Sequence, residues 1–256
     1  MKSRASALFR SFRLRPHGNT LAYSAVILLA LAPVWAAAGA TESARPLDHV
    51  DHAGGCEDGE ESLARVQARY DSIADLEASF EQRTEALLLA GTGGVGAEAS
   101  RGKVLLAKPG RMRWSYEEPE PSLVVSDGET LWVYDPSAGQ VTRVRMGGGY
   151  PAGAALQFLF GSGQLREVFS AEVLGCGPAG VEIGLVPREA ASFERLSLIV
   201  SPDDSLIRES SIVDLFGNRT TIRFSEIVLN KSPSPELFDF EPPVGTELLE
   251  LSAEAR

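Results

Sequence analysis

Apolar and polar residues alternate along most of this chain, a pattern typical of half-buried β-strands. The clearest case is residues 102–136, where three strand-like runs carry Trp114, Tyr116, Trp132 and Tyr134. Turn sequences (Lys-Pro-Gly, Pro-Glu-Pro and Asp-Gly) interrupt these runs. The same alternation marks seven further segments: 75–89, 140–144, 172–174, 180–187, 193–200, 207–214 and 218–230. The pattern predicts a mainly β domain, a meander of about ten strands with a few short helices.

Helical periodicity occurs in three places. Residues 60–73 place apolar side chains at spacings of three and four behind an acidic first turn, which predicts an amphipathic helix. A short apolar helix is predicted behind Pro151, covering 154–160, and a helical turn over 164–169. Glycines bracket the apolar helix, so the pattern fits either a core helix packed on the sheet or a lid over an apolar cavity.

The first 40 residues have the composition of a secretory signal peptide. A basic start precedes an apolar core at 21–35 and a run of small residues, which predicts cleavage near Ala38 or Ala40. A core of about 15 residues is shorter than the roughly 20 that a membrane-spanning helix needs. Residues 41–59 are polar and glycine-rich, which predicts a disordered leader. Residues 60–250 then form a single domain, and the proline-rich tail at 232–249 ends it.

The formal net charge is −11. The predicted signal peptide contains basic but no acidic residues, so its removal would make the net charge more negative. Such a surface disfavours nucleic acid and anionic lipid headgroups as partners. Export would permit a disulfide between Cys56 and Cys176, although the sequence leaves that pairing open. Cys56 lies too far from the apolar core for a lipid-attachment site.

The sequence offers little catalytic chemistry. Residues 91–96 match the dinucleotide pattern GxGxxG, but a strand rather than a helix is predicted after them, which favours a hairpin loop. Ser162 lies between glycines without the spacing of a nucleophile elbow. No histidine follows His52, so the domain cannot hold a Ser-His triad or a histidine zinc site. We predict no catalytic residue, metal or cofactor.

The order of motifs is more specific than any one of them. The motifs are SFEQ at 79–82, GKV at 102–104, KPGRMRWSY at 108–116, VSDG at 125–128, LWVYDP at 131–136, DLFGNRTT at 214–221 and LFDF at 237–240. This order closely resembles the periplasmic outer-membrane lipoprotein carrier family of the LolA type. The resemblance covers about residues 62–248, and its segment at 108–136 is the most specific.

The resemblance implies an incomplete, open antiparallel β-barrel of about ten to eleven strands covered by a helical lid, with an apolar cavity between them. It also implies a monomeric periplasmic chaperone rather than an enzyme. Such a chaperone takes lipoproteins by their acyl chains from an inner-membrane ABC-type release complex and passes them to an outer-membrane receptor. Which lipoproteins are carried does not follow from the sequence.

The walls of such a cavity must be apolar and pliable, because each exposed methylene of an acyl chain costs about 0.8 kcal/mol. We predict the following wall residues: Met112, Trp114, Leu131, Val133, Leu156, Leu159 and Phe160. The family commonly has an arginine before the proline of the KP turn, thought to latch the lid to helix backbone. Lys108 occupies that position here, so Lys108, Arg111 and Arg113 are the candidate latch residues.

Three other functions remain open at this stage. A receptor of the same fold would need a lipidated cysteine next to the signal core. A lipid- or lipoprotein-binding sensor of the same fold usually carries an additional domain. An enzyme of lipid metabolism would need the histidine or nucleophile that the domain lacks.

Overall fold

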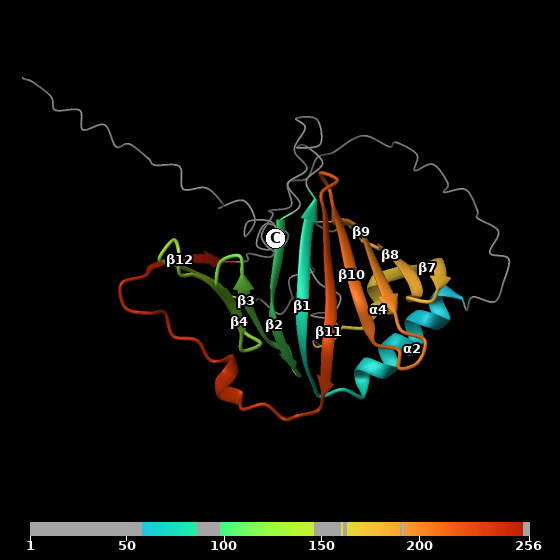
Figure 1. Ribbon diagram of the computed structural model, residues 1–256, viewed down its shortest axis with the longest axis horizontal. Helices are drawn as coiled ribbons and strands as arrows, with labels where there is room; N and C mark the ends of the chain where they lie inside the picture. Colours follow the sequence, from blue (N-terminus) through green and yellow to red (C-terminus); the bar gives the residue numbers. More distant parts are fainter. Residues whose placement is uncertain are drawn as a thin grey trace, which may run out of the picture.

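The computed structural model describes residues 58–85, 98–145, 160, 163–189, 191 and 193–252. These residues form one sheet of twelve strands in the order β12-β6-β5-β4-β3-β2-β1-β11-β10-β9-β8-β7 (Figure 1). The strands are β1 (Asp75–Glu85), β2 (Glu98–Ala107), β3 (Arg111–Glu118), β4 (Ser122–Ser126), β5 (Thr130–Asp135), β6 (Gln140–Arg145), β7 (Phe169–Gly177), β8 (Gly180–Pro187), β9 (Phe193–Val200), β10 (Ile207–Asp214), β11 (Arg219–Leu229) and β12 (Glu247–Ser252).

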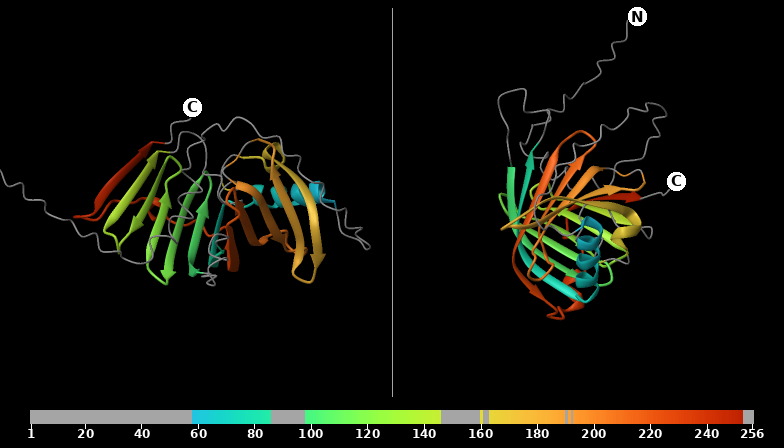
Figure 2. Two further views of the ribbon diagram at one scale, coloured as in Figure 1. Left: turned by 90° about the horizontal axis from the view of Figure 1, so that it is seen from above. Right: turned by 90° about the vertical axis from the view of Figure 1, so that its right-hand side faces the viewer.

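The sheet curves into an open half-barrel with a concave and a convex face (Figure 2). Its two edge strands, β12 and β7, are not paired with each other, so the barrel stays open. This confirms the mainly β, open-barrel fold class expected from the sequence. All neighbouring strands pair antiparallel except β6 and β12, which run parallel.

The period-two pattern of the sequence decides which side chains face inwards. In β1, Leu76, Ala78, Phe80 and Gln82 are buried on the concave face, while the residues between them are more exposed. The register continues this division, because Phe80 is paired with Gly102 on β2 and with Phe224 on β11. Directly opposed residues lie on the same face, so the apolar rows of successive strands join into one inner wall.

Helix α2 (Gly59–Asp71) lies on the concave side, against β7, β8 and α4 (Leu165–Val168). Asp58 caps its start, since the carboxylate accepts hydrogen bonds from the backbone N–H groups of Glu60 (2.9 Å) and Glu61 (3.3 Å). The apolar stripe of Leu63, Val66 and Tyr70 is fully buried. The helix predicted over 60–73 and the helical turn predicted over 164–169 are both confirmed.

The C-terminal segment was not predicted correctly. The chain does not end its fold in a proline-rich tail but forms a 3-10 helix, η2 (Pro235–Phe238), and then β12, which adds a parallel strand beside β6. Parallel pairing needs a long connection that local alternation cannot show. Strand β2 also begins at Glu98, four residues before the strand-like runs predicted from residue 102.

Several predicted features lie outside the described residues. These are the signal peptide, most of the leader, the GxGxxG match at 91–96 and the apolar helix apart from Phe160. Cys176 on β7 is disulfide-bonded, and the sequence has one other cysteine, Cys56, which lies outside the described part. Within the described ranges, no helix is long and apolar enough to cross a membrane, and no group of acidic, histidine or cysteine side chains could hold a metal ion.

Candidate functional site: the concave face and its helix

Four of the predicted wall residues lie together on the concave face. Met112 and Trp114 of β3 are each 3% exposed, and Leu131 of β5 is 5% exposed. Val133 of β5 is partly buried and packs against this core. Strand β4 connects the two pairs, because Ser126 is opposed to both Met112 and Leu131.

Aromatic rings dominate the centre of this wall. The Phe80 ring lies 5.0 Å from both the Trp114 and the Tyr116 ring, edge to face in each case. The Trp114 ring also lies 6.2 Å from the Phe224 ring of β11. Edge-to-face ring pairs contribute about 0.5–1.5 kcal/mol each beyond the apolar area that they bury, so these rings form a cohesive apolar wall.

Phe160 lies at the C-terminal end of α2. Its side chain is 1% exposed, and its ring meets the Tyr70 ring edge to face at 6.1 Å. Its carbonyl accepts a hydrogen bond of 2.8 Å from the backbone N–H of Gly110 in the KPG turn. The neighbouring predictions, Leu156 and Leu159, fall outside the described residues.

Lys108 joins the end of β2 to the end of α2. Its ammonium group donates to the carbonyl oxygens of Tyr70 (2.6 Å) and Asp71 (3.3 Å). The last carbonyls of a helix have no partner within the helix and carry its negative dipole end, so a cation is favoured there. The backbone N–H of Lys108 also donates to Ala74 O at 2.9 Å. Lys108 therefore bonds to helix backbone at two carbonyl oxygens.

Arg111 and Arg113 point away from this helix contact and hold the C-terminal segment instead. The Arg113 guanidinium donates to Leu237 O at 3.0 Å, and that of Arg111 lies 5.2 Å from the Phe238 ring centre. Arg111 also donates to Lys108 O at 3.0 Å. Of the three candidate latch residues, Lys108 is the one that the structure brings to α2.

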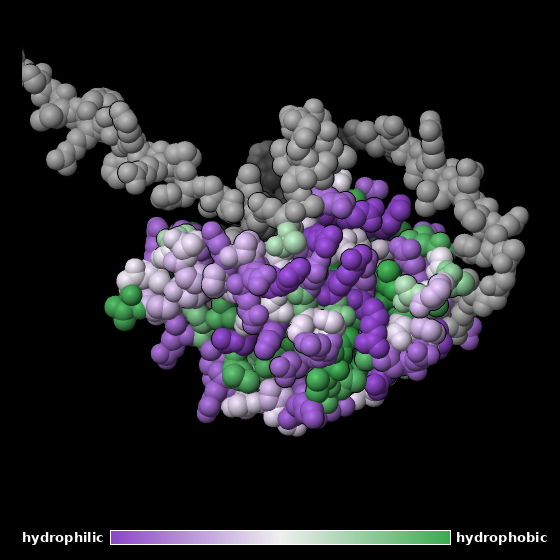
Figure 3. Space-filling model, in the orientation of Figure 1, coloured by the Kyte–Doolittle hydropathy of each residue, from purple (hydrophilic) through white to green (hydrophobic). Residues whose placement is uncertain are grey.

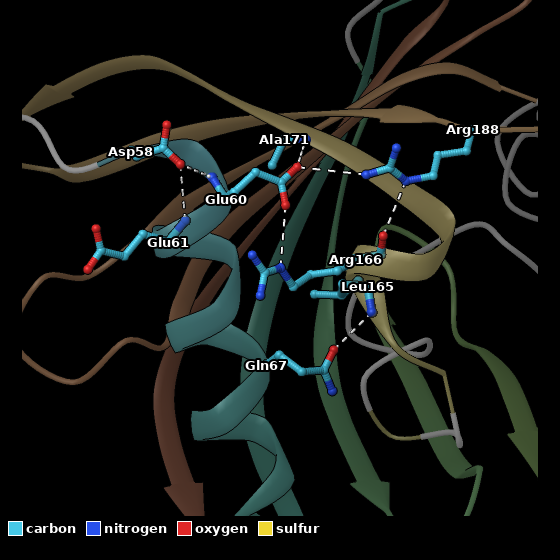
Figure 4. Close-up of polar contacts among 8 residues, drawn as sticks. All are labelled: Asp58, Glu60, Glu61, Gln67, Leu165, Arg166, Ala171 and Arg188. Carbon is cyan, nitrogen blue, oxygen red and sulfur yellow. Dashed lines mark hydrogen bonds and ion pairs between the residues drawn. The ribbon is translucent and has the colours of Figure 1, made fainter.

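The opposite end of α2 is fixed by polar contacts to α4 and β7 (Figure 4). The Glu60 carboxylate accepts from the backbone N–H of Ala171 at 3.1 Å and lies 3.4 Å from Arg166 Nε and 3.9 Å from Arg188 Nη2. About two turns further along α2, Gln67 Oε1 accepts from the backbone N–H of Leu165 at 2.9 Å. Sequence reasoning missed both residues, although a glutamine on the apolar stripe of a helix, as here, signals a buried polar contact.

Tyr70 adds a buried hydrogen bond at the C-terminal end of α2. Its hydroxyl accepts from the backbone N–H of Ile207 at 3.1 Å. Burial raises the pKa of Tyr70 well above its ordinary value, and the hydrogen bond from Ile207 offsets this only in part. Burial in the folded protein therefore favours the neutral hydroxyl of Tyr70. Helix α2 is thus held by one apolar stripe, by polar bonds at its two ends and by the Gln67 bond between them.

The convex face has the opposite character. Over β1, β10 and β11 the surface is mostly hydrophilic (Figure 3), with ion pairs Arg83–Glu81 and Arg223–Glu209 at 2.6 Å. The Arg83 hydrogen bond holds the pKa of the Glu81 carboxyl below its ordinary value. This polar surface faces solvent, so an apolar ligand would be accommodated on the concave side.

Comparisons with known proteins agree with this geometry. The family model described as "Outer membrane lipoprotein carrier protein LolA" matches residues 71–241. An outer-membrane lipoprotein carrier protein of Dechloromonas aromatica is 33% identical over 59% of this chain and 72% of its own length. The proteins of that name from Alkalilimnicola ehrlichii and Azotobacter vinelandii are 31% and 32% identical, over 71% and 75% of this chain and 80% and 89% of theirs. With its open half-barrel, apolar concave wall and covering helix, the chain belongs to the LolA family of outer-membrane lipoprotein carrier proteins.

Proposed function

We propose that this protein is a periplasmic carrier that binds the acyl chains of lipoproteins against the concave face of its sheet. The observation that carries the proposal is the continuous apolar wall of Phe80, Met112, Trp114, Leu131 and Val133, on the same side of the sheet as α2. Burying one sixteen-carbon chain on such a wall is favourable by about 10 kcal/mol at about 0.8 kcal/mol per methylene.

Release requires that the same chains can leave again. Besides its apolar stripe, α2 is held by a small number of polar bonds, so its displacement breaks few hydrogen bonds. In this proposal Lys108 is the latch at the C-terminal end of α2, in place of the arginine common in the family. Lysine offers a compact point charge rather than a planar fork, so its bonds to the two carbonyls are easier to exchange.

The localisation and the partners follow from the same proposal. The protein would be exported by its signal peptide, cleaved near Ala38 or Ala40, and would act in the periplasm as a monomer. Its lipoprotein cargo would come from an ABC-type release complex in the inner membrane and pass to an outer-membrane receptor. Binding and transfer need no bond-breaking step, so the proposed activity is that of a chaperone and not of an enzyme.

A charge placed on the concave wall tests the proposal. Val133→Glu introduces a carboxylate on the wall, and Val186→Glu makes the same change at a valine of β8 that is 42% exposed. Both proteins are checked by circular dichroism and then added to spheroplasts to measure lipoprotein release. We expect Val186→Glu to release lipoprotein like the wild type and Val133→Glu to lose release at least tenfold. Leu159→Glu tests the predicted apolar helix in the same assay.

The result that would overturn the proposal is full release activity in a folded Val133→Glu protein. Equal loss in the Val186→Glu control would show instead that any added charge impairs the protein. Mass spectrometry of lipid and lipoprotein that co-purify with the wild type identifies the cargo directly. A preparation that carries neither, from cells that make lipoproteins, would also contradict the carrier function.

A further inference from the structure

Four side-chain atoms in the described part of the sheet are buried without a hydrogen-bond partner there. Two are the Nε atoms of Arg111 and Arg143, whose guanidinium groups lie over the rings of Phe238 and Trp132 on the convex side. The other two lie on the concave face. They are the indole N–H of Trp114 and the hydroxyl of Ser122, whose side chains belong to residues that are 3% and 7% exposed. Buried polar groups are almost always hydrogen-bonded, and each exception calls for an explanation. The concave face is the one that the proposed cargo would occupy.

The register places these two residues close together on the concave face. Trp114 of β3 is opposed to Val124 of β4, and Tyr116 is opposed to Ser122. Trp114 and Ser122 are therefore diagonal neighbours on one face of an antiparallel pair, about 7–8 Å apart, with both groups within reach of one polar ligand.

A third polar contact borders them. The Tyr116 hydroxyl donates to Gln82 Oε1 at 3.0 Å, and both side chains are buried. Tyr116 is on β3 and Gln82 on β1, so the bond crosses β2. It crosses at Gly102, where an added Cβ would collide with the carbonyl oxygen of Ser115, so that only glycine fits. The sheet thus keeps one position without a side chain beneath this polar bridge.

These four residues mark a boundary on the inner wall. Towards the Lys108 end, the concave residues of β1, β2 and β3 are apolar, namely Leu76, Leu106 and Met112. On β4 the buried Ser126 opposes Met112, and its hydroxyl already accepts a hydrogen bond from the backbone N–H of Gly128. Towards the opposite end, the next inward pair is Thr84 and Thr220, whose hydroxyls lie 3.3 Å apart. An amphiphile lying along the wall would therefore place its chains towards Lys108 and its polar end at the four residues.

We propose that Trp114 and Ser122, beside the Gln82–Tyr116 bridge, form a polar anchor that binds the ester carbonyl oxygens of a diacylglyceryl group. This inference rests on the carrier function proposed above. Both unpartnered groups can donate, and an ester carbonyl accepts hydrogen bonds but cannot donate. A hydrocarbon chain meets the apolar wall equally well with or without a carbonyl, so the anchor would distinguish ester-linked from ether-linked chains.

The test compares lipids that differ in this one group. The probes are a synthetic cysteinyl peptide with two ester-linked palmitoyl chains, the same peptide with two ether-linked hexadecyl chains, and an ester-linked dipalmitoyl phosphatidylglycerol. Binding to the protein is measured by titration, and the indole N–H resonances are followed by NMR. We expect the ester peptide to bind about fivefold more tightly than the ether peptide, the factor that one hydrogen bond contributes.

Trp114→Phe keeps an aromatic ring but removes the N–H. We expect it to lose about fivefold in affinity for the ester peptide, the share of the Trp114 hydrogen bond, and to bind the ether peptide as the wild type does. The matched control is Trp132→Phe on β5, whose ring packs on the convex side against Phe240 and should leave the fivefold preference unchanged. In the wild type, the Trp114 resonance should move to lower field with the ester peptide only, while that of Trp132 stays in place. This spectrum decides the question even if the Trp114→Phe protein does not fold.

The outcomes separate the anchor from the carrier function. Equal binding of ester and ether peptides, with the Trp114 resonance in the same place for both, overturns the anchor and leaves the carrier function standing. Failure of both peptides to bind overturns both proposals. Binding of the phospholipid with the same Trp114 shift supports an anchor for any diacylglycerol ester, whereas binding of the ester peptide alone supports one that also needs the cysteinyl end.

Discussion

The contact between Lys108 and the end of α2 gives the sharpest prediction. Lys108→Met keeps most of the aliphatic stem but removes the ammonium group and its bonds to the Tyr70 and Asp71 carbonyls. A hydrogen bond to a charged group contributes about 1.5–3 kcal/mol. Lys108 is only half-buried, so solvent screening lowers the expected effect to about 1–2 kcal/mol.

The effect should be local to the helix. Opening of α2 would then become about 5–30 times more frequent, the factor that corresponds to 1–2 kcal/mol. Amide hydrogen exchange, followed by mass spectrometry of peptides from α2, measures this directly. Peptides from β3 should keep their wild-type rates, because Lys108 does not contribute to the pairing of β3 with β4.

Two further variants sharpen the experiment. Lys103→Met removes an exposed lysine of β2, the strand that ends just before Lys108, and should leave the exchange of α2 unchanged. Lys108→Arg restores the residue common in the family and, with a planar fork for the two carbonyls, should slow exchange or leave it as in the wild type. If Lys108→Met and Lys103→Met give the same exchange in α2, Lys108 does not latch the helix and the reasoning fails.

Two predictions concern other contacts of α2. Glu60→Gln should lower the free energy of unfolding by less than about 1 kcal/mol, because its ion pairs are partly exposed. In thermal melts, the loss of stability caused by Glu60→Gln should become smaller in 0.5 M salt, because salt screens the ion pairs. The exposed control Glu61→Gln should show no such change with salt. A loss in Glu60→Gln that does not depend on salt would contradict the ion-pair explanation. Tyr70→Phe leaves the buried N–H of Ile207 without a partner and should cost about 1–3 kcal/mol at pH 7 in urea unfolding. Burial raises the pKa of Tyr70, so above pH 10 the tyrosine ionises in the unfolded chain but not in the folded one. The free energy of unfolding of the wild type should therefore fall above pH 10, and its difference from that of Tyr70→Phe should narrow. A difference that stays constant above pH 10 would contradict this reasoning.

Local patterns in the sequence predict most of the sheet and the position of helix α2. Alternation at period two is a property of each strand alone, and it correctly placed the inward faces of β3 and β5 with Met112, Trp114 and Leu131. The spacing of Leu63, Val66 and Tyr70 likewise determined the buried stripe of α2. Local patterns sufficed wherever burial of one face was the deciding force.

Contacts between residues far apart in the sequence depend on how the strands and the helix pack in three dimensions. Lys108 bonds to carbonyls 37 and 38 residues away, whereas Arg111 and Arg113, equally basic and only a few residues further, contact the C-terminal segment. The pleat of β3 turns both arginines to the convex face, and the end of β2 brings Lys108 to the helix. Strand β12 and the Gln82–Tyr116 bridge depend in the same way on register. Alternation tells which face a residue occupies, but only the pairing of strands tells what it finds there.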